Sequence, residues 1–549
     1  MKRRVIVVGL DGATFDLMDP LLEKGELPFI ENLINNGTRA RLLSTIPYAT
    51  IPAWPSFMTG KNPGRHGVFD FFSFAGGQRR ISNSRDIRSA TLWEILTAHG
   101  KRSIVMNVPG TFPPAEINGV VVSGMLTPVG ATFVSPPEVE GFLSEATGGY
   151  RVNSRSHLSG LKLVEDVHEV TQKHKAGFLA LLKSQDWDFA MVMFRATDVI
   201  AHHFWEEQNV IRECYRYMDG IMGEIVGAFP DATILLVSDH GFQGQLKDFH
   251  INKWLIDHGY MCIKKGHGTE ASRWQEIGRL EGRAELAEVY LQPSSASRVL
   301  LRLGLTGRKL RKFIPRAWWN ALKELAPRTL RDHIPATADA GYGVDWEHTQ
   351  ASAYQLYAME SKAIKVMNVD QPSRGRVRAE LAEKLAGLRD PQTAGPIVRR
   401  AYRREELYVG PYVDQSPDII LDLHDGYNIT NAFFAEDYVT PREHARGCHH
   451  REGIFTACGD DIEGGKELDS HLSLLDVMPT VLHYFGLPVP DDCDGKVVRE
   501  IFDRDSESYQ REVLYEKMEW KGYVADGALP YRDDEQAEIE ERLKALGYL

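Results

Sequence analysis

The chain has 549 residues, of which 43% are hydrophobic and 26% are charged, and this composition is typical of a globular protein. Its length is too great for one ordinary domain and is sufficient to bury a large core. The formal net charge of −12 argues against nucleic acid as the default partner, but it permits small anionic substrates, because bound cations can reverse the local field.

The first segment of the chain gives no sign of export or membrane insertion. Its apolar run, VIVV, ends at Gly9 and Asp11 and is too short for a signal peptide. No other stretch approaches the roughly 18 apolar residues of a membrane span. The five cysteines show no Cys-x-x-Cys spacing, so neither a disulfide framework nor a thiolate metal site is indicated. We therefore expect a cytoplasmic protein.

Short runs rich in valine and isoleucine alternate with helical patterns along most of the chain. Leu27, Ile30 and Leu33 recur at helical spacing before Gly37, and a similar repeat starting at Leu92 ends at Gly100. This alternation predicts an α/β fold with a doubly wound, mostly parallel sheet and helices on both faces. The predicted strands are Val5–Val8, Ser103–Val108, Val120–Val122, Phe189–Phe194, Thr233–Val237, Asp418–Leu421 and Gly453–Ala457.

One block interrupts the alternation. Residues 266–344 lack strand patterns and are rich in basic, helix-forming sequence, so we expect an inserted basic helical cap. The catalytic core would then comprise residues 1–265 and 345–505, and residues 506–549 would form a tail helix. Three roles stay open for the cap: a solvated helical surface, a lid over an anionic substrate, or a contact surface for anionic lipid.

Polar residues follow two of the predicted strands. Asp11 comes directly after the first strand, and Asp239 and His240 follow the strand Thr233–Val237. In doubly wound sheets, ligands bind outside the carboxyl ends of the strands. A charged pair after a buried strand is costly unless it faces a cleft or coordinates a cation, although Asp11 alone would equally suit a turn.

Further candidate ligands lie in separate segments. Asp198 and His202 are four residues apart, so a helix would place both within reach of one cation, and oxygen plus imidazole suits Zn²⁺ or Mn²⁺. A threonine hydroxyl such as that of Thr50 becomes a nucleophile when a cation lowers its pKa. Together, seven residues are of the types needed to bind two divalent cations and to supply a nucleophile. They are Asp11, Thr50, Asp198, His202, Asp239, His240 and His449.

These motifs, in this order, resemble the alkaline phosphatase superfamily and in particular its type I phosphodiesterase/nucleotide pyrophosphatase branch. The resemblance covers about residues 1–260 and 345–500 and implies an alkaline-phosphatase-like core. The segments that carry it are Asp11 at a strand end, Thr50-Ile51-Pro52 with Thr59-Gly60, Asp198 to His202, Asp239-His240-Gly241 and Gly447-Cys448-His449.

The resemblance also implies cofactors and a mechanism. Two divalent metal ions, Zn²⁺ or alternatively Mn²⁺, would activate Thr50, which would attack phosphorus and form a phosphothreonine intermediate. We assign His449 rather than His450 as a ligand because it fits the Gly-x-His motif. The implied sets are Asp198, His202 and His449 for one metal, and Asp11, Thr50, Asp239 and His240 for the other.

The same resemblance narrows the class of reaction that we expect. Sulfatases of this superfamily need Cys or Ser where this chain has Thr50, so sulfatase activity is not expected. Nucleotide pyrophosphatases commonly carry Asn where this chain has Ala53, so phosphate must find other contacts, for which Trp54, Lys61 and Arg65 are candidates. We expect hydrolysis of small phosphate esters, with phosphodiesters favoured. A phosphomonoesterase, a phosphonate-ester hydrolase and a non-catalytic binding module stay as alternatives.

Overall fold

The computed structural model describes residues 2–73, 80–155, 157–265, 342–353, 363–435, 437–518 and 531–546. Within these ranges, the largest element is a ten-stranded sheet in the order β20-β2-β19-β9-β1-β8-β5-β6-β7, with β21 paired to β2. The strands from β9 to β6 are parallel, whereas β19 and β7 run antiparallel to their neighbours. The strand bounds are β1 (Val5–Leu10), β2 (Thr38–Leu43), β5 (Ser103–Met106), β6 (Gly119–Val122), β7 (Val134–Ser135), β8 (Phe189–Phe194), β9 (Thr233–Val237), β19 (Glu452–Cys458), β20 (Lys466–Glu467) and β21 (Leu472–Ser473).

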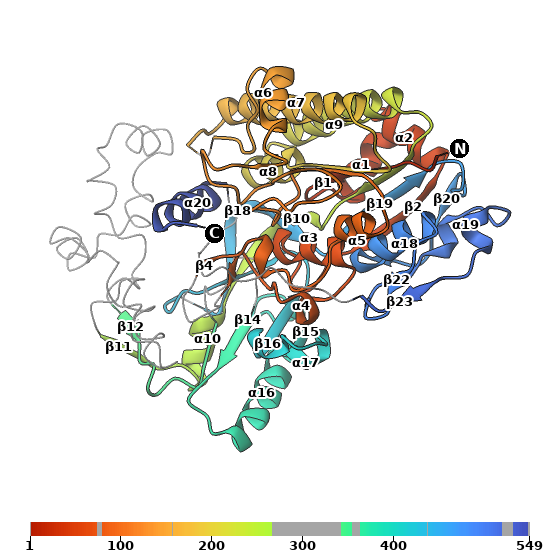
Figure 1. Cartoon of the computed structure of the whole chain (residues 1–549). Helices are drawn as coiled ribbons and strands as arrows, with labels where there is room; N and C mark the ends of the chain where they lie inside the picture. The colour runs from red at the N-terminus through yellow and green to blue at the C-terminus, as the bar shows by residue number, and fades with distance from the viewer. Residues whose placement is uncertain are drawn as a thin grey trace.

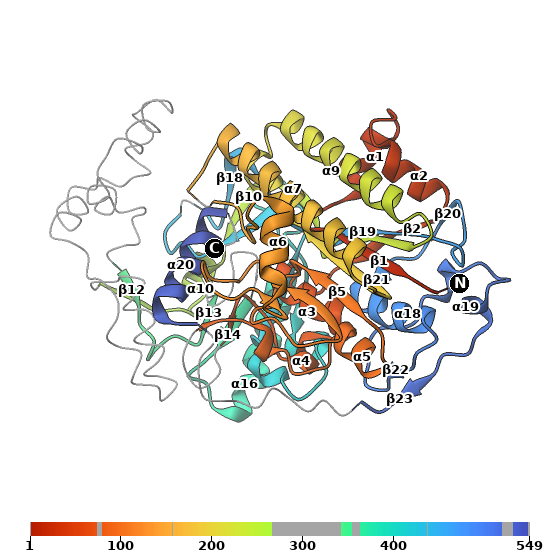
Figure 2. The same ribbon diagram turned by 45° about the horizontal axis from the view of Figure 1, so that its top comes forward.

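Helices cover both faces of this sheet, and the predicted doubly wound α/β fold is confirmed (Figure 1). Helices α7 and α9 lie side by side over one face, with α6 packed across α7, while α3, α5 and α18 lie on the other face (Figure 2). The bounds of these helices and of α2 are α2 (Pro28–Asn35), α3 (Thr50–Thr59), α5 (Leu92–Ala98), α6 (Val139–Thr147), α7 (Leu161–Ser184), α9 (Gln208–Ala228) and α18 (Val477–Tyr484).

The central strands are buried along their whole length. Every residue of β1, β8 and β9 is buried, as expected for continuous apolar runs covered by helices on both faces. Helices α2 and α5 confirm the two helical repeats of the sequence, and both contribute buried side chains to the main core. This packing holds the carboxyl ends of β9, β1 and β8 next to one another.

A second, smaller lobe packs around its own hydrophobic core, which takes its buried side chains from Phe249 to Val439. Its sheet has the order β13-β14-β16-β15 and is antiparallel throughout. The sequence placed Asp418–Leu421 in the main sheet, but β16 lies in this second sheet. The elements of the lobe include α10 (Ile251–Asp257), β13 (Ala351–Ala353), β14 (Ala363–Val366), α16 (Gln371–Ala386), β15 (Val398–Arg403) and β16 (Ile419–Leu423).

This lobe changes how the chain is divided. Much of the segment from residue 345 to 439, which the sequence placed in the catalytic core, packs in the second lobe. A buried apolar run looks the same in either sheet, so hydrophobic periodicity could not assign β16 to one of them. A ribbon joins the lobes: β10 (Gly241–His250) runs antiparallel to β18 (Val439–His450) and parallel to β17 (Tyr427–Thr430).

The predicted cap and tail are only partly described. Residues 266–341 lie outside the described residues, but the flanks of this block meet, because β11 (Ile263–Lys265) pairs antiparallel with β12 (Tyr342–Val344). The tail contains α20 (Asp533–Leu546), which packs side chains into the main core and lies near the C-terminus in Figure 1. None of the helices in the described ranges has the length and apolarity needed to cross a bilayer.

Candidate active site

Two carboxylates meet at the carboxyl ends of neighbouring strands. Asp11 follows β1 and Asp239 lies two residues past β9, and both side chains are fully buried. The N–H of Asp11 donates to the carbonyl of Phe194 at the end of β8 (2.9 Å). Gly12 has a φ of 67°, and an added Cβ would stand 3.3 Å from Cβ of Asp198, so glycine permits the tight turn that brings these segments together.

The other predicted residues arrive from four different elements. Helix α8 (Ala196–Phe204) carries Asp198 and His202 on one face, as their spacing predicts. His240 directly precedes β10, His449 lies near the end of β18, and Thr50 is the first residue of α3. The structure therefore brings all seven predicted ligand and nucleophile residues together, and all seven are buried.

The side chains form two adjoining sets of donor atoms. In the first, Oδ1 of Asp198 lies 3.4 Å from Nε2 of His202 and 3.2 Å from Nε2 of His449, and these two nitrogens are 2.9 Å apart. This arrangement converges three ligand atoms of the types that Zn²⁺ and Mn²⁺ accept.

The second set surrounds Nε2 of His240. Oδ1 of Asp11 lies 3.5 Å from it, Oδ2 of Asp239 3.3 Å and Oγ1 of Thr50 3.3 Å. The rings of His240 and His449 stack with centroids 3.6 Å apart, so the two sets are in direct contact. Within the described residues, Asp198, His240 and His449 also offer ligand atoms within 4.8 Å of one another, as do Asp11, Asp239 and His240.

Hydrogen bonds fix the tautomers that metal binding needs. Nδ1 of His240 lies 3.0 Å from the carbonyl of Gly241, and Nδ1 of His449 lies 3.3 Å from the carbonyl of Tyr48. A carbonyl only accepts, so in both rings Nδ1 carries the proton and Nε2 presents its lone pair to the cluster. Such outer contacts are typical of metal-binding histidines.

The carboxylates support the same interpretation. Both oxygens of Asp11 and Oδ2 of Asp239 are buried, and no hydrogen bond to them is found among the described residues. Buried carboxylates without hydrogen bonds are costly unless a cation compensates them. The residues present therefore fit two divalent cations at this site.

The pKa values of Asp11, Asp239 and His240 are shifted in directions that suit a bound cation. Burial, together with Asp239 and Asp198, raises the pKa of Asp11 well above its usual range, and the charge of Arg195 opposes this rise. Burial raises the pKa of Asp239 to about 7. Burial also lowers the pKa of His240 far below its usual value, so this ring is neutral and available as a ligand. The histidines beside Asp198 instead lower the pKa of that carboxyl well below its usual range. Divalent cations would supply positive charge that favours the ionised forms of Asp11 and Asp239.

Thr50 stands at a bend in the backbone. Its neighbour Ile51 has φ −111° and ψ 106°, so the regular helical turn of α3 starts just after it. The hydroxyl of Thr50 faces His240, and the first N–H groups of a helix favour a nearby anion.

The three residues expected to contact substrate have other neighbours. Nζ of Lys61 lies 2.6 Å from Asp492, and Nε of Arg65 lies 2.9 Å from Asp494. Trp54 is fully buried in the main core, where its ring lies against Gly9 of β1. The sequence could not show these contacts, because they join segments far apart in the chain.

Arg195 is the residue at this site that the sequence analysis missed. It directly follows β8 and precedes α8, which carries Asp198, and its charge acts on Asp11. The signal was present, since a basic residue at the end of a predicted strand is as unusual as the aspartates that were singled out.

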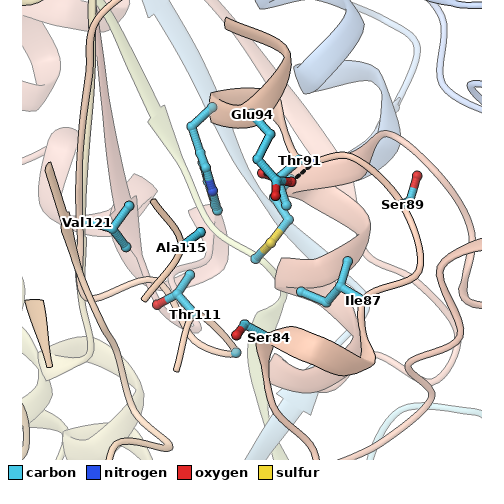
Figure 3. A pocket seen from close by; sticks show the side chains of 11 residues that line it. Ser84, Ile87, Ser89, Thr91, Glu94, Thr111, Ala115 and Val121 are labelled. Atoms are coloured by element: carbon cyan, nitrogen blue, oxygen red, sulfur yellow. Dashed lines mark hydrogen bonds between the residues drawn. The ribbon is translucent and has the colours of Figure 1, made fainter. Parts of the chain in front are cut away.

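A separate pocket is lined by Met58 of α3 and by residues of the segment 84–121 (Figure 3). Its only carboxylate, Glu94, accepts hydrogen bonds from both the N–H and the hydroxyl of Thr91 at the start of α5 (2.8 Å each). This carboxylate therefore caps a helix, and the pocket offers no second cluster of catalytic groups among the residues that line it.

The chain is similar in sequence to one known family and in structure to solved proteins. The family model described as type I phosphodiesterase/nucleotide pyrophosphatase matches residues 5–445. Phosphonoacetate hydrolase from Sinorhizobium meliloti 1021, in complex with phosphonoformate, has a TM-score of 0.51 and 14% identity, covering 87% of this chain and 94% of that chain. Murine ectonucleotide pyrophosphatase/phosphodiesterase 5 has a TM-score of 0.49 and 12% identity, covering 91% of this chain and 100% of that chain. No curated protein sequence matches the chain.

Proposed function

Because the chain belongs to the type I phosphodiesterase/nucleotide pyrophosphatase family, a branch of the alkaline phosphatase superfamily, it is a metal-dependent phosphoester hydrolase, and we propose that Thr50 is its nucleophile. The observation that carries this proposal is the position of the Thr50 hydroxyl, 3.3 Å from Nε2 of His240 within a buried set of ligand-type side chains.

We assign the two cations as the resemblance implies, and we propose Zn²⁺, with Mn²⁺ as the alternative. When bound, they supply positive charge that lowers the pKa of a coordinated hydroxyl and stabilises the oxygens of the phosphoryl group. The first site would comprise Asp198, His202 and His449, and the second would comprise Asp11, Asp239, His240 and the oxygen of Thr50.

The reaction then proceeds on Thr50. The Thr50 hydroxyl gives up its proton to solvent and its oxygen forms a bond to phosphorus, while the bond from phosphorus to the leaving oxygen breaks and that oxygen takes up a proton from water. This leaves a phosphothreonine, which still carries the second ester group when the substrate is a diester. Water displaces this phosphoryl group and restores the hydroxyl. The N–H groups at the start of α3 stabilise the negative charge of the phosphoryl oxygens.

We propose phosphodiesters as the favoured substrates. Monoesters and phosphonate esters can use the same residues, so hydrolysis rates of nitrophenyl phosphate diester, monoester, phosphonate and sulfate esters, measured at equal concentration, rank these substrates.

A cytoplasmic location agrees with the five free cysteines among the described residues. We retain residues 266–344 as a proposed cap that starts and ends at the paired strands β11 and β12.

The test of the nucleophile is the Thr50→Ala variant. We expect it to lose hydrolysis of bis(4-nitrophenyl) phosphate while keeping most of its metal, because three side chains of the second site remain. Thr45→Ala is the matched control, since the hydroxyl of Thr45 only donates to the carbonyl of Pro47 (2.9 Å). Turnover at the wild-type rate in Thr50→Ala would exclude Thr50 as the nucleophile.

A further inference from the structure

Phe242 is a buried aromatic residue beside two of the proposed metal ligands. It is the second residue of β10, and in the register of β10 and β18 it lies directly opposite His449. Only 2% of the residue is exposed. A phenyl ring has no donor atom for a cation, so any effect of Phe242 on the site must pass through the residues that it contacts.

The phenyl ring contacts both imidazoles of the first metal site. The ring of His202 stands nearly perpendicular to it, with centroids 4.8 Å apart and an interplanar angle of 79°. The ring of His449 is tilted by 59°, and its centroid is 5.6 Å away. Both distances lie within the range of about 4.5–7 Å in which aromatic rings attract one another. One side chain therefore packs against two ligands that come from different elements, α8 and β18.

Glycines give the phenyl ring a close fit. A Cβ added to Gly12 would stand 3.0 Å from Cδ2 of Phe242, and one added to Gly447 would stand 2.7 Å from Cε1. The ring is thus confined by the turn after β1 and by β18. Trp205, the residue after α8, also packs on it, with centroids 5.7 Å apart. A ring confined by backbone and by a second aromatic side chain has little freedom to move, so it can hold its neighbours in place.

The first metal site depends on the angles of its two imidazoles. Their Nε2 atoms are 2.9 Å apart and lie 3.4 Å (His202) and 3.2 Å (His449) from Oδ1 of Asp198. The torsion that turns an imidazole about its Cβ–Cγ bond has broad minima, so the surrounding packing has to select the angle at which Nε2 points to a shared cation.

We propose that Phe242 is a positioning residue for the first metal site, and that its ring holds His202 and His449 at the angles at which their Nε2 atoms meet Oδ1 of Asp198. The proposal rests on the proposed function, because it takes these three residues as the ligands of one cation. Within the described residues, Phe242 makes no ring contact with His240, so the second site should depend on it much less. A role in core packing alone would not distinguish the two sites.

The affinities of the two ions in Phe242→Leu test the proposal. Leucine keeps the position apolar but removes the ring. The metal-loaded full-length proteins are titrated with a chelator that changes colour when it binds Zn²⁺, which resolves the two ions by affinity. We expect one ion to bind about 10- to 100-fold more weakly, the range for residues that orient metal ligands, and the other to stay within about 3-fold of the wild type.

A second variant identifies the weakened ion. His449→Ala removes a ligand of the first site, so the ion that remains belongs to the second site. Adding Phe242→Leu to this background should leave the affinity for the remaining ion within about 3-fold.

Phe189→Leu is the matched control, because Phe189 is also buried in the main core but begins β8, at the opposite end of the strand from the site. It should weaken neither ion. If Phe242→Leu does not fold, Phe242→Met takes its place with the same expected loss, since the flexible side chain of methionine fills irregular space but has no ring.

Unchanged affinity for both ions in the folded Phe242 variant, or an equal loss for both, would overturn the proposal. Weaker binding of the remaining ion when Phe242→Leu is added to His449→Ala would do the same, because that loss would fall on the second site. A wild-type protein that binds two Zn²⁺ ions but hydrolyses none of the nitrophenyl esters would refute the proposed function instead. The titration does not depend on turnover, so it tests the role of Phe242 separately.

Discussion

Replacing Gly9 with alanine tests how the packing of α3 positions Thr50. Gly9 lies in β1, and a Cβ added there would stand 2.7 Å from Cη2 of Trp54 and 3.1 Å from Cγ of Met193. Ordinary contacts of such an atom begin at 3.4 Å, so Trp54 must retreat by about 0.7 Å. Trp54 lies four residues after Thr50, in the regular turn of α3 that follows the bend at Ile51, so we expect the displacement to reach the proposed nucleophile through this short segment.

The expected effect is large on activity and moderate on stability. Overpacking a well-filled core costs about 1–3 kcal/mol, and misplacing a reacting group by about 1 Å can cost about 100-fold in rate. For Gly9→Ala we therefore expect kcat on bis(4-nitrophenyl) phosphate to fall by about 10- to 100-fold and the free energy of unfolding to fall by about 1–3 kcal/mol. Steady-state kinetics and urea denaturation measure the two quantities.

Two further variants make this test specific. Gly220→Ala adds the same methyl group in α9, where it meets nothing within 4 Å, and it should leave kcat unchanged. Trp54→Phe in the Gly9→Ala background makes room for the methyl group and should restore part of kcat. If Gly9→Ala loses stability but keeps kcat within about two-fold of the wild type, the position of α3 does not govern Thr50, and the reasoning fails.

Two other predictions concern histidines. His449→Ala should lower the metal content from about two ions per chain to about one. His450, with Nε2 3.6 Å from Oδ1 of Asp425, is the control, and His450→Ala should keep both ions. Equal metal losses in the two variants, measured by elemental analysis, would contradict the assignment. Burial, with a contribution from Lys61, lowers the pKa of His66 from 6.5 to about 3, and the neutral ring joins Ser56 (2.9 Å) to the N–H of Val68 (3.2 Å). The unfolded chain binds the extra proton below pH 6.5, so His66 makes the protein less stable as the pH falls, by about 2 kcal/mol at pH 5. In His66→Gln, the loss of unfolding free energy between pH 7 and pH 5, measured with urea, should shrink by about that amount, and an undiminished loss would show that His66 already titrates normally in the folded protein.

The sequence predicted the core sheet and the membership of the site for specific physical reasons. Asp11 and Asp239 stand out because a charged side chain within two residues of the end of a buried strand needs a partner. The spacing of Asp198 and His202 places them on one face of a helix whatever that helix packs against. These patterns involve residues that are close together in the sequence, so they can be interpreted without the tertiary structure.

The features that the sequence did not predict all depend on distant contacts. Lys61 pairs with Asp492, on a segment more than 400 residues away, so its charge looked available for substrate. The carbonyl of Tyr48 that orients His449 has no side-chain signature at all. The apolar run of β16 fits either sheet, and only the second hydrophobic core decides between them.

The ribbon of β10 and β18 has a consequence for how this protein can change. In its register, Phe242 pairs with His449, so the strand that leaves His240 is bonded directly to the strand that brings back His449. The segment 241–448 is therefore held at both ends by backbone hydrogen bonds, directly beside the proposed metal ligands His240 and His449. Because the cost of closing a loop grows slowly with its length, this segment can gain, lose or exchange sequence while the ligands stay in place. The ribbon thus lets the second lobe evolve independently of the proposed catalytic cluster.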